Sequence, residues 1–206
     1  MDEKEEIKKD GFKTVKDYKV VDRIKIAVDL IGKHHKVLEL GCRTGEVTKL
    51  YCEDNDVTGI DFIPEFIKEA EKLKGTFWCW DLEEDLPFIN NVFDVVFCGE
   101  VIEYLHNRKK CLREIHRVLK RGGRLIITEP NKFSFRRRLK FLTGYEIHEH
   151  KHFLHLFRYD ELEYIIRCAG FKITKWINGK IHIKGITLPF KSKTLCDVWV
   201  VEAVKK

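Results

Sequence analysis

Three acidic side chains stand at the ends of three successive apolar runs. Glu39 lies in VLELGCRTG, Asp61 ends VTGID, and Asp81 ends FWCWD. Gly41 and Gly45 flank the turn after the first run, and glycine lets a backbone turn sharply and approach a ligand closely. An acid about twenty positions after such a turn suits ribose hydroxyls. Together the acids suit a nucleoside joined to a cationic amino acid, and they suit a pyrophosphate poorly.

The turn does not match the known phosphate-binding motifs, and each acid also has a purely structural explanation. The residues from Gly41 to Gly45 lack the G-x-G-x-x-G spacing, and no Gly-Lys-Ser/Thr follows. Asp61 equally fits the N-cap of a helix that starts near Pro64. Asp81 could equally be a turn residue, and Glu39 could serve only to stabilise the glycine loop.

The predicted elements place these acids at one edge of a sheet. Apolar runs predict strands at 36–40, 56–61, 75–81, 92–100 and 124–129, and the segments FKITKWI and LCDVWVVEAV close the chain as a hairpin-like pair. Because the central runs are apolar throughout, both faces of those strands are expected to be covered. Alternation of strands and helices predicts right-handed crossovers and a parallel sheet, so the fold class is α/β.

Helical spacing predicts the connections. The first thirty or so residues read as helix up to Gly32, a short helix follows the glycine turn at 47–51, and another begins near Pro64. The short helix would direct free N–H groups at a ligand. The helix at 107–121 is expected to end with basic residues and a left-handed cap at Gly122. A last helix carries Leu162, Ile165, Ile166 and Ala169 on one side.

In their order, these motifs resemble the class I S-adenosylmethionine-dependent methyltransferases, in the small-molecule, type 11-like branch. VLELGCRTG resembles the first motif, VTGIDFIPEFIKEA the second-strand motif, WDLEEDLPFINNVFDVVFCGEVIEYLHN the adenine-side motif, and CLREIHRVLKRGGRLIITEPN the helix and fifth strand. The match covers residues 36–131, with a looser one in HLFRYDELEYIIRCAGFKI. The resemblance implies a Rossmann-like, doubly wound, mostly parallel seven-stranded sheet with an antiparallel C-terminal strand pair. It also implies S-adenosyl-L-methionine as cofactor and S-adenosyl-L-homocysteine as product.

The resemblance further implies which residues bind the cofactor. Glu39, Gly41, Cys42 and Gly45 would contact the methionine part, Asp61 the ribose, Phe62 or Ile63 one adenine face, Asp81 and Leu82 the adenine edge, and Gly99 and Glu100 the floor beside the sulfonium. This chain departs from the family at Arg43, where a glycine is frequent. Arg43 adds bulk and positive charge near a cationic cofactor.

The acceptor side is predicted in the segment from Asn131 to Phe157, which follows the fifth strand and is expected to form a lid. It contains His148, His150, His152 and His155. We predict His152 and His155 as catalytic bases, which methyl transfer needs only where the acceptor loses a proton. Solvated or core histidines are the competing explanation. Histidines without a matched carboxylate shell are a weak zinc signal, so no metal is expected.

The same segment leaves the class of acceptor open. Arg136, Arg137, Arg138 and Lys140 alternate with aromatics, which suits an RNA phosphate backbone, and an exposed basic helix face explains them equally well. The main hypothesis is a methyltransferase with a small-molecule acceptor. The alternatives are a tRNA or other RNA methyltransferase, and a methyltransferase-like binding protein without activity.

Composition fits a single domain of 206 residues, with 44% apolar and 35% charged residues and a net charge of +6. We expect an N-terminal helical part at 1–35, a cofactor-binding core at 36–130, the lid at 131–157, and a C-terminal helix and strand pair at 158–206. No apolar run approaches the roughly 18 residues of a membrane span. The charged N-terminus is unlike a signal peptide, so a cytoplasmic monomer or homodimer without a membrane partner is expected.

Cysteine usage points to a reducing compartment. The chain has 7 cysteines without paired C-x-x-C spacing. Cys79, Cys98 and Cys196 fall within apolar runs, so they are expected to be small core residues on strands.

Overall fold

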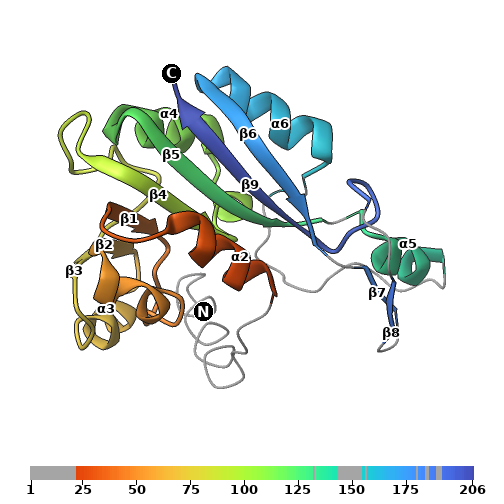
Figure 1. Ribbon diagram of the computed structural model, residues 1–206, viewed down its shortest axis with the longest axis horizontal. Helices are drawn as coiled ribbons and strands as arrows, with labels where there is room; N and C mark the ends of the chain where they lie inside the picture. Colours follow the sequence, from red (N-terminus) through yellow and green to blue (C-terminus); the bar gives the residue numbers. More distant parts are fainter. Residues whose placement is uncertain are drawn as a thin grey trace.

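Seven strands form one sheet in the computed structural model, which describes residues 22–131, 133–142, 155, 157–179, 181–183, 186–188 and 192–206. The strands are β1 (Lys36–Leu40), β2 (Asp56–Asp61), β3 (Thr76–Cys79), β4 (Phe93–Gly99), β5 (Leu119–Pro130), β6 (Phe171–Asn178) and β9 (Val198–Lys205). Their order across the sheet is β3-β2-β1-β4-β5-β9-β6 (Figure 1). β1 to β5 pair in parallel, whereas β9 runs antiparallel to β5 and β6. The predicted fold class is therefore confirmed.

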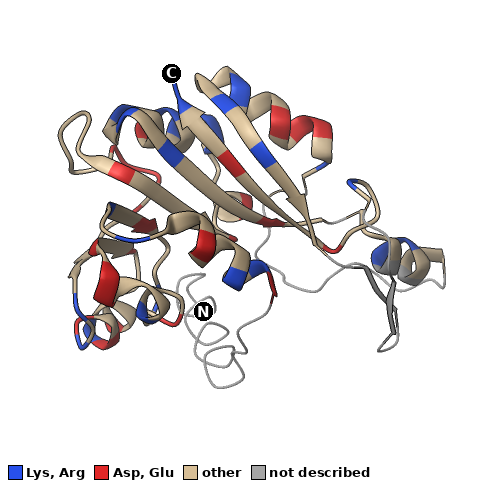
Figure 2. Cartoon of the chain, in the orientation of Figure 1, with Lys and Arg blue, Asp and Glu red and all other residues tan. Residues whose placement is uncertain are grey.

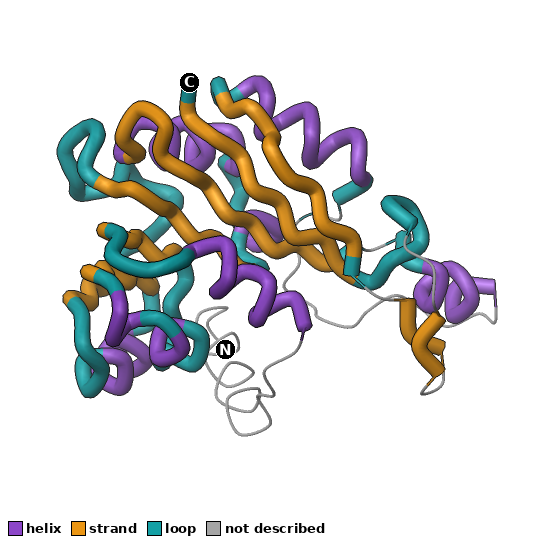
Figure 3. The backbone as a smooth tube through the Cα atoms, viewed as in Figure 1, coloured by secondary structure: helices purple, strands orange, loops and turns teal. Residues whose placement is uncertain are grey.

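Helices cover both faces of the sheet, as the continuous apolar strands required. α2 (Asp22–Ile31) packs on one face, and α4 (Arg108–Val118) and α6 (Tyr159–Cys168) pack on the other (Figure 3). α3 (Pro64–Ala70) lies beside β2 and β3. Alternate residues of one strand serve the two cores: Val37 packs in the α2 core, and Leu38 packs in the α4 and α6 core.

α4 shows how local signals and packing agree. The Asn107 side chain accepts a hydrogen bond from the Lys110 N–H at 3.1 Å, which satisfies one free donor of the first turn. Leu112, Ile115 and Val118 recur at helical spacing and are fully buried. These two features fix where α4 starts and which face it buries.

The short α-helix expected after the glycine turn is absent, and that prediction was wrong. Two 3-10 helices, η1 (Thr48–Leu50) and η2 (Cys52–Asp54), occupy this stretch instead. The Leu50 N–H bonds to the Val47 carbonyl at 2.9 Å, and the Tyr51 N–H bonds to that of Thr48 at 3.1 Å. This tighter winding lets the Thr48 and Tyr51 hydroxyls reach Glu39. The loop therefore has no α-helical N-terminus to offer a ligand.

The end of α4 also differs from the sequence prediction. α4 ends at Val118, and the basic residues expected in its last turn already belong to β5. Lys120 pairs with Asp94 of β4 at 2.7 Å, which holds this stretch against the neighbouring strand. Gly122 does adopt a left-handed conformation, with φ +74, but within an irregular part of the β4–β5 ladder rather than as a helix cap.

Two cysteine predictions need correction as well. Cys79 lies on β3 at the edge of the sheet and is exposed, because an edge strand has no neighbour on one side. Cys196 is buried, but it precedes β9 and lies outside any strand. Cys98 is buried on β4, as predicted.

Beyond the main sheet lies α5 (Phe135–Leu142), in the stretch for which a basic helix was one of the two sequence interpretations. A small antiparallel pair, β7 (Ile181–Ile183) and β8 (Ile186–Leu188), was not predicted from sequence patterns. Most of the predicted lid at 131–157 falls outside the described residues, as does the helix expected before Asp22. No helix among the described residues has the length and apolar character needed to cross a bilayer.

Candidate functional site

The glycine loop lies where the parallel strands β1 and β2 both end. Gly41 has φ +67 and Gly45 has φ +83, conformations that favour glycine. The N–H groups of Gly41 and Cys42 both donate to the Ile60 carbonyl of β2, at 2.8 and 3.1 Å. At Gly41 a Cβ would come within 2.6 Å of Val101, so neighbouring side chains also exclude anything larger.

Arg43 sits in this loop with φ +50, a left-handed conformation that glycine adopts more easily. The frequent family glycine at this position thus has a conformational reason. The Arg43 guanidinium lies over the Phe66 ring of α3, 5.7 Å from its centroid. Its backbone N–H donates to Asp61 Oδ2 at 3.1 Å. Arg43 is therefore held against α3 and the end of β2.

Glu39 is buried beneath the loop, with 3% of its surface exposed. Its Oε2 accepts hydrogen bonds of 2.5 Å from both the Thr48 and Tyr51 hydroxyls. Burial raises the pKa of Glu39 to about 7, against the lowering effect of these two bonds, and the negative charges of Glu46 and Asp61 raise it further. The side chain thus does brace the loop, and a nearby cation would favour its ionised form.

Glu46 is a second acid at this place that sequence reasoning missed. It is 8% exposed, and its Oε1 has no hydrogen-bond partner among the described residues. Its charge contributes to the raised pKa of both Glu39 and the Cys42 thiol, so the three groups lie close together. A buried carboxylate oxygen without a partner is costly unless a ligand satisfies it. The only sequence signal was an acid directly after Gly45.

Asp61 ties the end of β2 to the glycine loop. It is 5% exposed, and its Oδ1 accepts from the Ile63 N–H at 3.0 Å while Oδ2 accepts from that of Arg43. Burial raises the pKa of Asp61, although these backbone hydrogen bonds oppose the rise. The N-cap of α3 is Ile63, and no side chain caps it, so the N-cap explanation for Asp61 is wrong. Phe62 and Ile63 follow directly.

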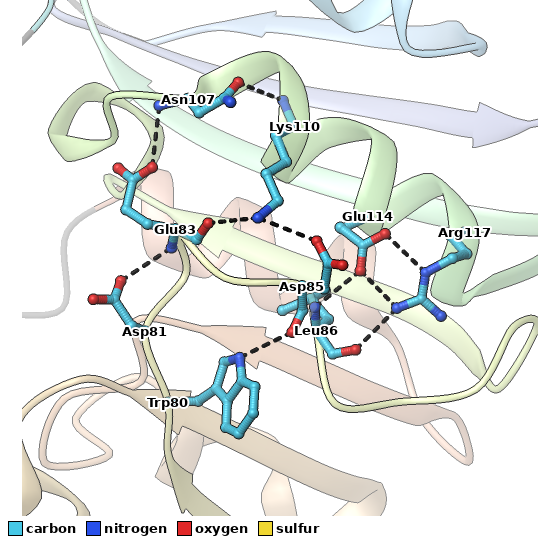
Figure 4. A network of polar contacts seen from close by, with 9 residues as sticks. All are labelled: Trp80, Asp81, Glu83, Asp85, Leu86, Asn107, Lys110, Glu114 and Arg117. Atoms are coloured by element: carbon cyan, nitrogen blue, oxygen red, sulfur yellow. Dashed lines mark hydrogen bonds and ion pairs between the residues drawn. The ribbon is translucent and has the colours of Figure 1, made fainter.

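Asp81 lies after β3 on an exposed turn that α4 clamps in place (Figure 4). Its Oδ1 accepts from the Glu83 N–H at 3.0 Å, as the turn explanation requires. The Glu83 carboxylate accepts from the Asn107 N–H at 3.2 Å, and Lys110 Nζ donates to the Glu83 carbonyl at 2.7 Å. The backbone that carries Asp81 and the half-buried Leu82 is thereby fixed relative to α4.

The end of β4 brings Gly99 and Glu100 to the same edge. Glu100 has φ +55, and its carboxylate forms a two-pronged pair with Arg23 of α2, at 2.8 and 3.1 Å. Arg23 is a residue that sequence reasoning missed. Burial raises the pKa of the neighbouring Cys98 thiol, which makes it a poor nucleophile.

Two further buried acids lie near this point. Glu103 and Glu129 are 0% exposed, and their charges, with that of Glu100, add to the raised pKa of Tyr104, whose main cause is burial. The positive charge of Arg43 acts on the same Tyr104 hydroxyl, so the loop after β4 and the glycine loop face each other.

Of the predicted bases, His155 is described and His152 is not, nor are His148 and His150. The ring Nε2 of His155 lies 2.5 Å from Glu161 Oε1 on α6, and the backbone N–H of His155 donates to the Glu103 carbonyl at 3.1 Å. Its ring also contacts Phe157 edge-on. Among the described residues, no group of His, Cys, Asp and Glu side chains is arranged to hold a metal ion.

The donor set fits the cofactor that the resemblance implied. Glu39 and Asp61 are buried acids near the ends of the adjacent strands β1 and β2, and Glu46 is a buried acid in the turn after Gly45. One carboxylate oxygen of Glu46 has no partner among the described residues. Carboxylates suit an amino group, a sulfonium and ribose hydroxyls, and they repel phosphate.

Comparisons with known proteins agree with this geometry. Residues 38–127 match the family model described as "Methyltransferase domain". An uncharacterised protein of Methanocaldococcus jannaschii is 40% identical over 48% of this chain and 46% of its own length. A demethylmenaquinone methyltransferase of Thermotoga maritima is 38% identical over 48% of this chain and 47% of its own. The chain thus spans about half the length of these curated relatives.

The fold has a close counterpart among solved structures. A Thermotoga maritima protein described as a SAM-dependent methyltransferase superposes with a TM-score of 0.72 at 21% identity, covering 89% of this chain and 87% of its own. A likeness at this identity shows the fold alone. The matched region, the sheet order and the glycine loop together support a class I S-adenosylmethionine-dependent methyltransferase of the type 11 branch in residues 38–127.

Proposed function

We propose that the chain is an S-adenosylmethionine-dependent methyltransferase with a small-molecule acceptor. The observation that carries the proposal is the set of buried acids around the glycine loop: Glu39, Glu46 and Asp61. Burying several carboxylates close together costs free energy unless cationic or hydroxyl groups compensate them. A methionine-linked adenosine supplies both kinds of group.

The proposed contacts are those that the family resemblance implies, with Glu46 added because it is buried beside the glycine loop. The loop backbone from Gly41 to Gly45 holds the methionine part, with Glu39 and Glu46 toward its amino group. Asp61 accepts from the ribose hydroxyls, Phe62 or Ile63 covers one adenine face, and Asp81 with Leu82 borders the adenine edge. Gly99 and Glu100 lie beside the sulfonium.

The cofactor, when bound, would supply a methyl group on a sulfonium sulfur, and an acceptor atom would bond to the methyl carbon in line as the sulfur leaves. The protein's share is to align the acceptor and exclude water. His152 and His155 stay the candidate bases for acceptors that lose a proton. The acid–histidine pair of Glu161 and His155 supports this role for His155, since the carboxylate fixes the ring orientation. Relatives named for methylation of demethylmenaquinone favour a small-molecule acceptor over RNA.

Cofactor binding is tested first by thermal unfolding. A ligand that binds only the native state raises the melting temperature by mass action. We expect S-adenosylmethionine and S-adenosylhomocysteine to raise the melting temperature. NAD should leave it unchanged, because the acidic side chains repel its pyrophosphate. The absence of a shift with both sulfur nucleosides at about a millimolar would contradict the proposal. Transfer of labelled methyl groups to fractionated small-molecule extract then tests activity.

A further inference from the structure

Helix α5 presents an apolar stripe to solvent. Phe135, Leu139 and Leu142 recur at helical spacing and therefore share one face. Their exposed fractions are 37%, 44% and 80%, and Phe141 beside them is 68% exposed. Such a stripe on a helix of a folded domain ordinarily packs on the core. Here more than a third of the surface of each of the three side chains stays in solvent.

The other side of α5 is anchored, so this orientation is built into the fold. Arg137 Nη1 donates to the Asn131 carbonyl at 2.8 Å. Asn131 is fully buried, and its side chain donates to the Cys196 carbonyl at 2.8 Å. The N–H of Phe135 donates to the Leu195 carbonyl at 3.0 Å. These bonds fix the start of α5 to the segment before β9.

The charge of α5 points to the kind of surface that covers the stripe. Its sequence FRRRLKFL holds four basic residues and no acidic one, and Figure 2 shows Lys and Arg positions gathered there. Exposed Arg138 retains further guanidinium donors after its Nε bonds to the Phe133 carbonyl. A basic helix with exposed Phe and Leu is typical of helices that lie in the interface of an anionic bilayer.

We propose that α5 docks the protein reversibly on an anionic lipid surface, with Phe135, Leu139 and Leu142 entering the acyl boundary and the exposed Arg138 meeting the headgroups. This differs from a membrane span, for which the helix is too short. It departs from the sequence prediction, which expected no membrane partner. Leucines favour lipid over RNA, because single-stranded RNA is held by aromatic stacking and basic grooves, to which exposed leucines add nothing.

The position of α5 suits such docking. It follows the end of β5, the edge to which the glycine loop also belongs, and it stands apart from the sheet in Figure 1. A docked α5 would therefore hold the carboxyl edge near the lipid surface. The inference does not depend on methyl transfer, since binding is measured without cofactor or acceptor.

Co-sedimentation with vesicles tests the proposal directly. We expect the full chain to bind vesicles of equal parts phosphatidylcholine and phosphatidylglycerol, and to bind pure phosphatidylcholine weakly. The double variant Leu139→Gln, Leu142→Gln should weaken binding at least about tenfold, because apolar burial drives insertion. Ile89→Gln is the matched control, since Ile89 is 79% exposed on the far loop between β3 and β4, and it should bind as the unchanged protein does.

The remaining outcomes are equally decisive. Raising the salt from 50 mM toward roughly ten times that value should release the protein, since screening weakens headgroup attraction. Equal binding by the double variant, or failure of the unchanged chain to bind anionic vesicles, would overturn the proposal. The proposal would also be overturned if the chain bound single-stranded RNA but no vesicles, and if the double leucine variant bound that RNA equally well. Melting curves confirm that each variant is folded.

Discussion

At the scale of single residues, Asp61 serves the fold and the proposed ligand at once. Both oxygens already accept backbone N–H groups, so its ribose contacts would add to existing bonds. We expect Asp61→Asn to lower the melting temperature and to weaken S-adenosylhomocysteine binding at least about tenfold, since a charge-assisted bond contributes about 1.5–3 kcal/mol. Calorimetric titration measures the affinity. Lower stability with unchanged affinity would show that Asp61 only closes the loop.

Glu39 predicts a pH dependence of stability. Its native pKa is raised from 4.5 to about 7, so the native state holds a proton that the unfolded chain has already lost between those pH values. Ionisation of Glu39 therefore destabilises the protein progressively as the pH rises through that window, by at most about 3 kcal/mol at 1.36 per unit. Below pH 4.5 the effect is absent.

Glu39→Gln removes this titration and still offers an oxygen to Thr48 and Tyr51. The free energy of unfolding of this variant, relative to that of the unchanged protein, should therefore increase as the pH rises from 4.5 to about 7. Urea unfolding at a series of pH values measures the difference. If the difference stays constant with pH, the raised pKa of Glu39 is wrong.

At the scale of elements, the glycine loop depends on both conformation and space. Gly41 and Gly122 have similar φ values, +67 and +74, but a Cβ at Gly41 meets Val101 at 2.6 Å whereas one at Gly122 meets nothing within 4 Å. We expect Gly122→Ala to cost about 1–2 kcal/mol, the usual cost of a left-handed alanine. Gly41→Ala should cost clearly more, and adding Val101→Ala should recover part of the difference. Urea unfolding measures the stability of all three variants. Equal costs for Gly41→Ala and Gly122→Ala would show that contact with Val101 does not destabilise an alanine at position 41.

Elements with continuous apolar runs could be predicted from sequence, and those that depend on distant partners could not. β1 and β2 have the predicted bounds because their residues are buried on both faces. The stretch from Val47 to Tyr51 has helical spacing, but its winding is set by the hydroxyl bonds to Glu39, which only the folded chain brings into reach. Arg23 and Glu46 were missed for the same reason: nothing near them in sequence shows what they face.

At the scale of the whole molecule, the two edges of the sheet have different tasks. The carboxyl edge gathers the glycine loop and the buried acids, and α5 follows it. Among the residues that the structure describes, the amino edge holds no such group, and contacts between distant parts of the chain close it. Sites of ligand binding in open parallel sheets occupy the carboxyl edge. Changes at the amino edge should therefore affect stability and leave ligand affinity unchanged.

Lys205 tests this division, because it closes the amino edge from the last strand. Its Nζ donates to the Leu119 carbonyl at 2.7 Å and to Asn91 Oδ1 at 2.9 Å, and it approaches the Arg117 carbonyl at 3.4 Å. The antiparallel direction of β9 brings its end beside the start of β5, so this one buried cation joins β9 to the end of α4 and to the loop before β4.

We expect Lys205→Met to lower the free energy of unfolding by about 1–3 kcal/mol, since it removes the side-chain donor that satisfies the buried Leu119 carbonyl. Urea unfolding measures the loss, and Lys206→Met, a change at the exposed neighbouring residue, should leave stability unchanged. Affinity for S-adenosylhomocysteine should stay the same in both variants, because the sites are distant and share no partners. If Lys205→Met weakens cofactor binding in the native protein, the two edges are coupled, and the separation of ligand binding from stability across this sheet is wrong.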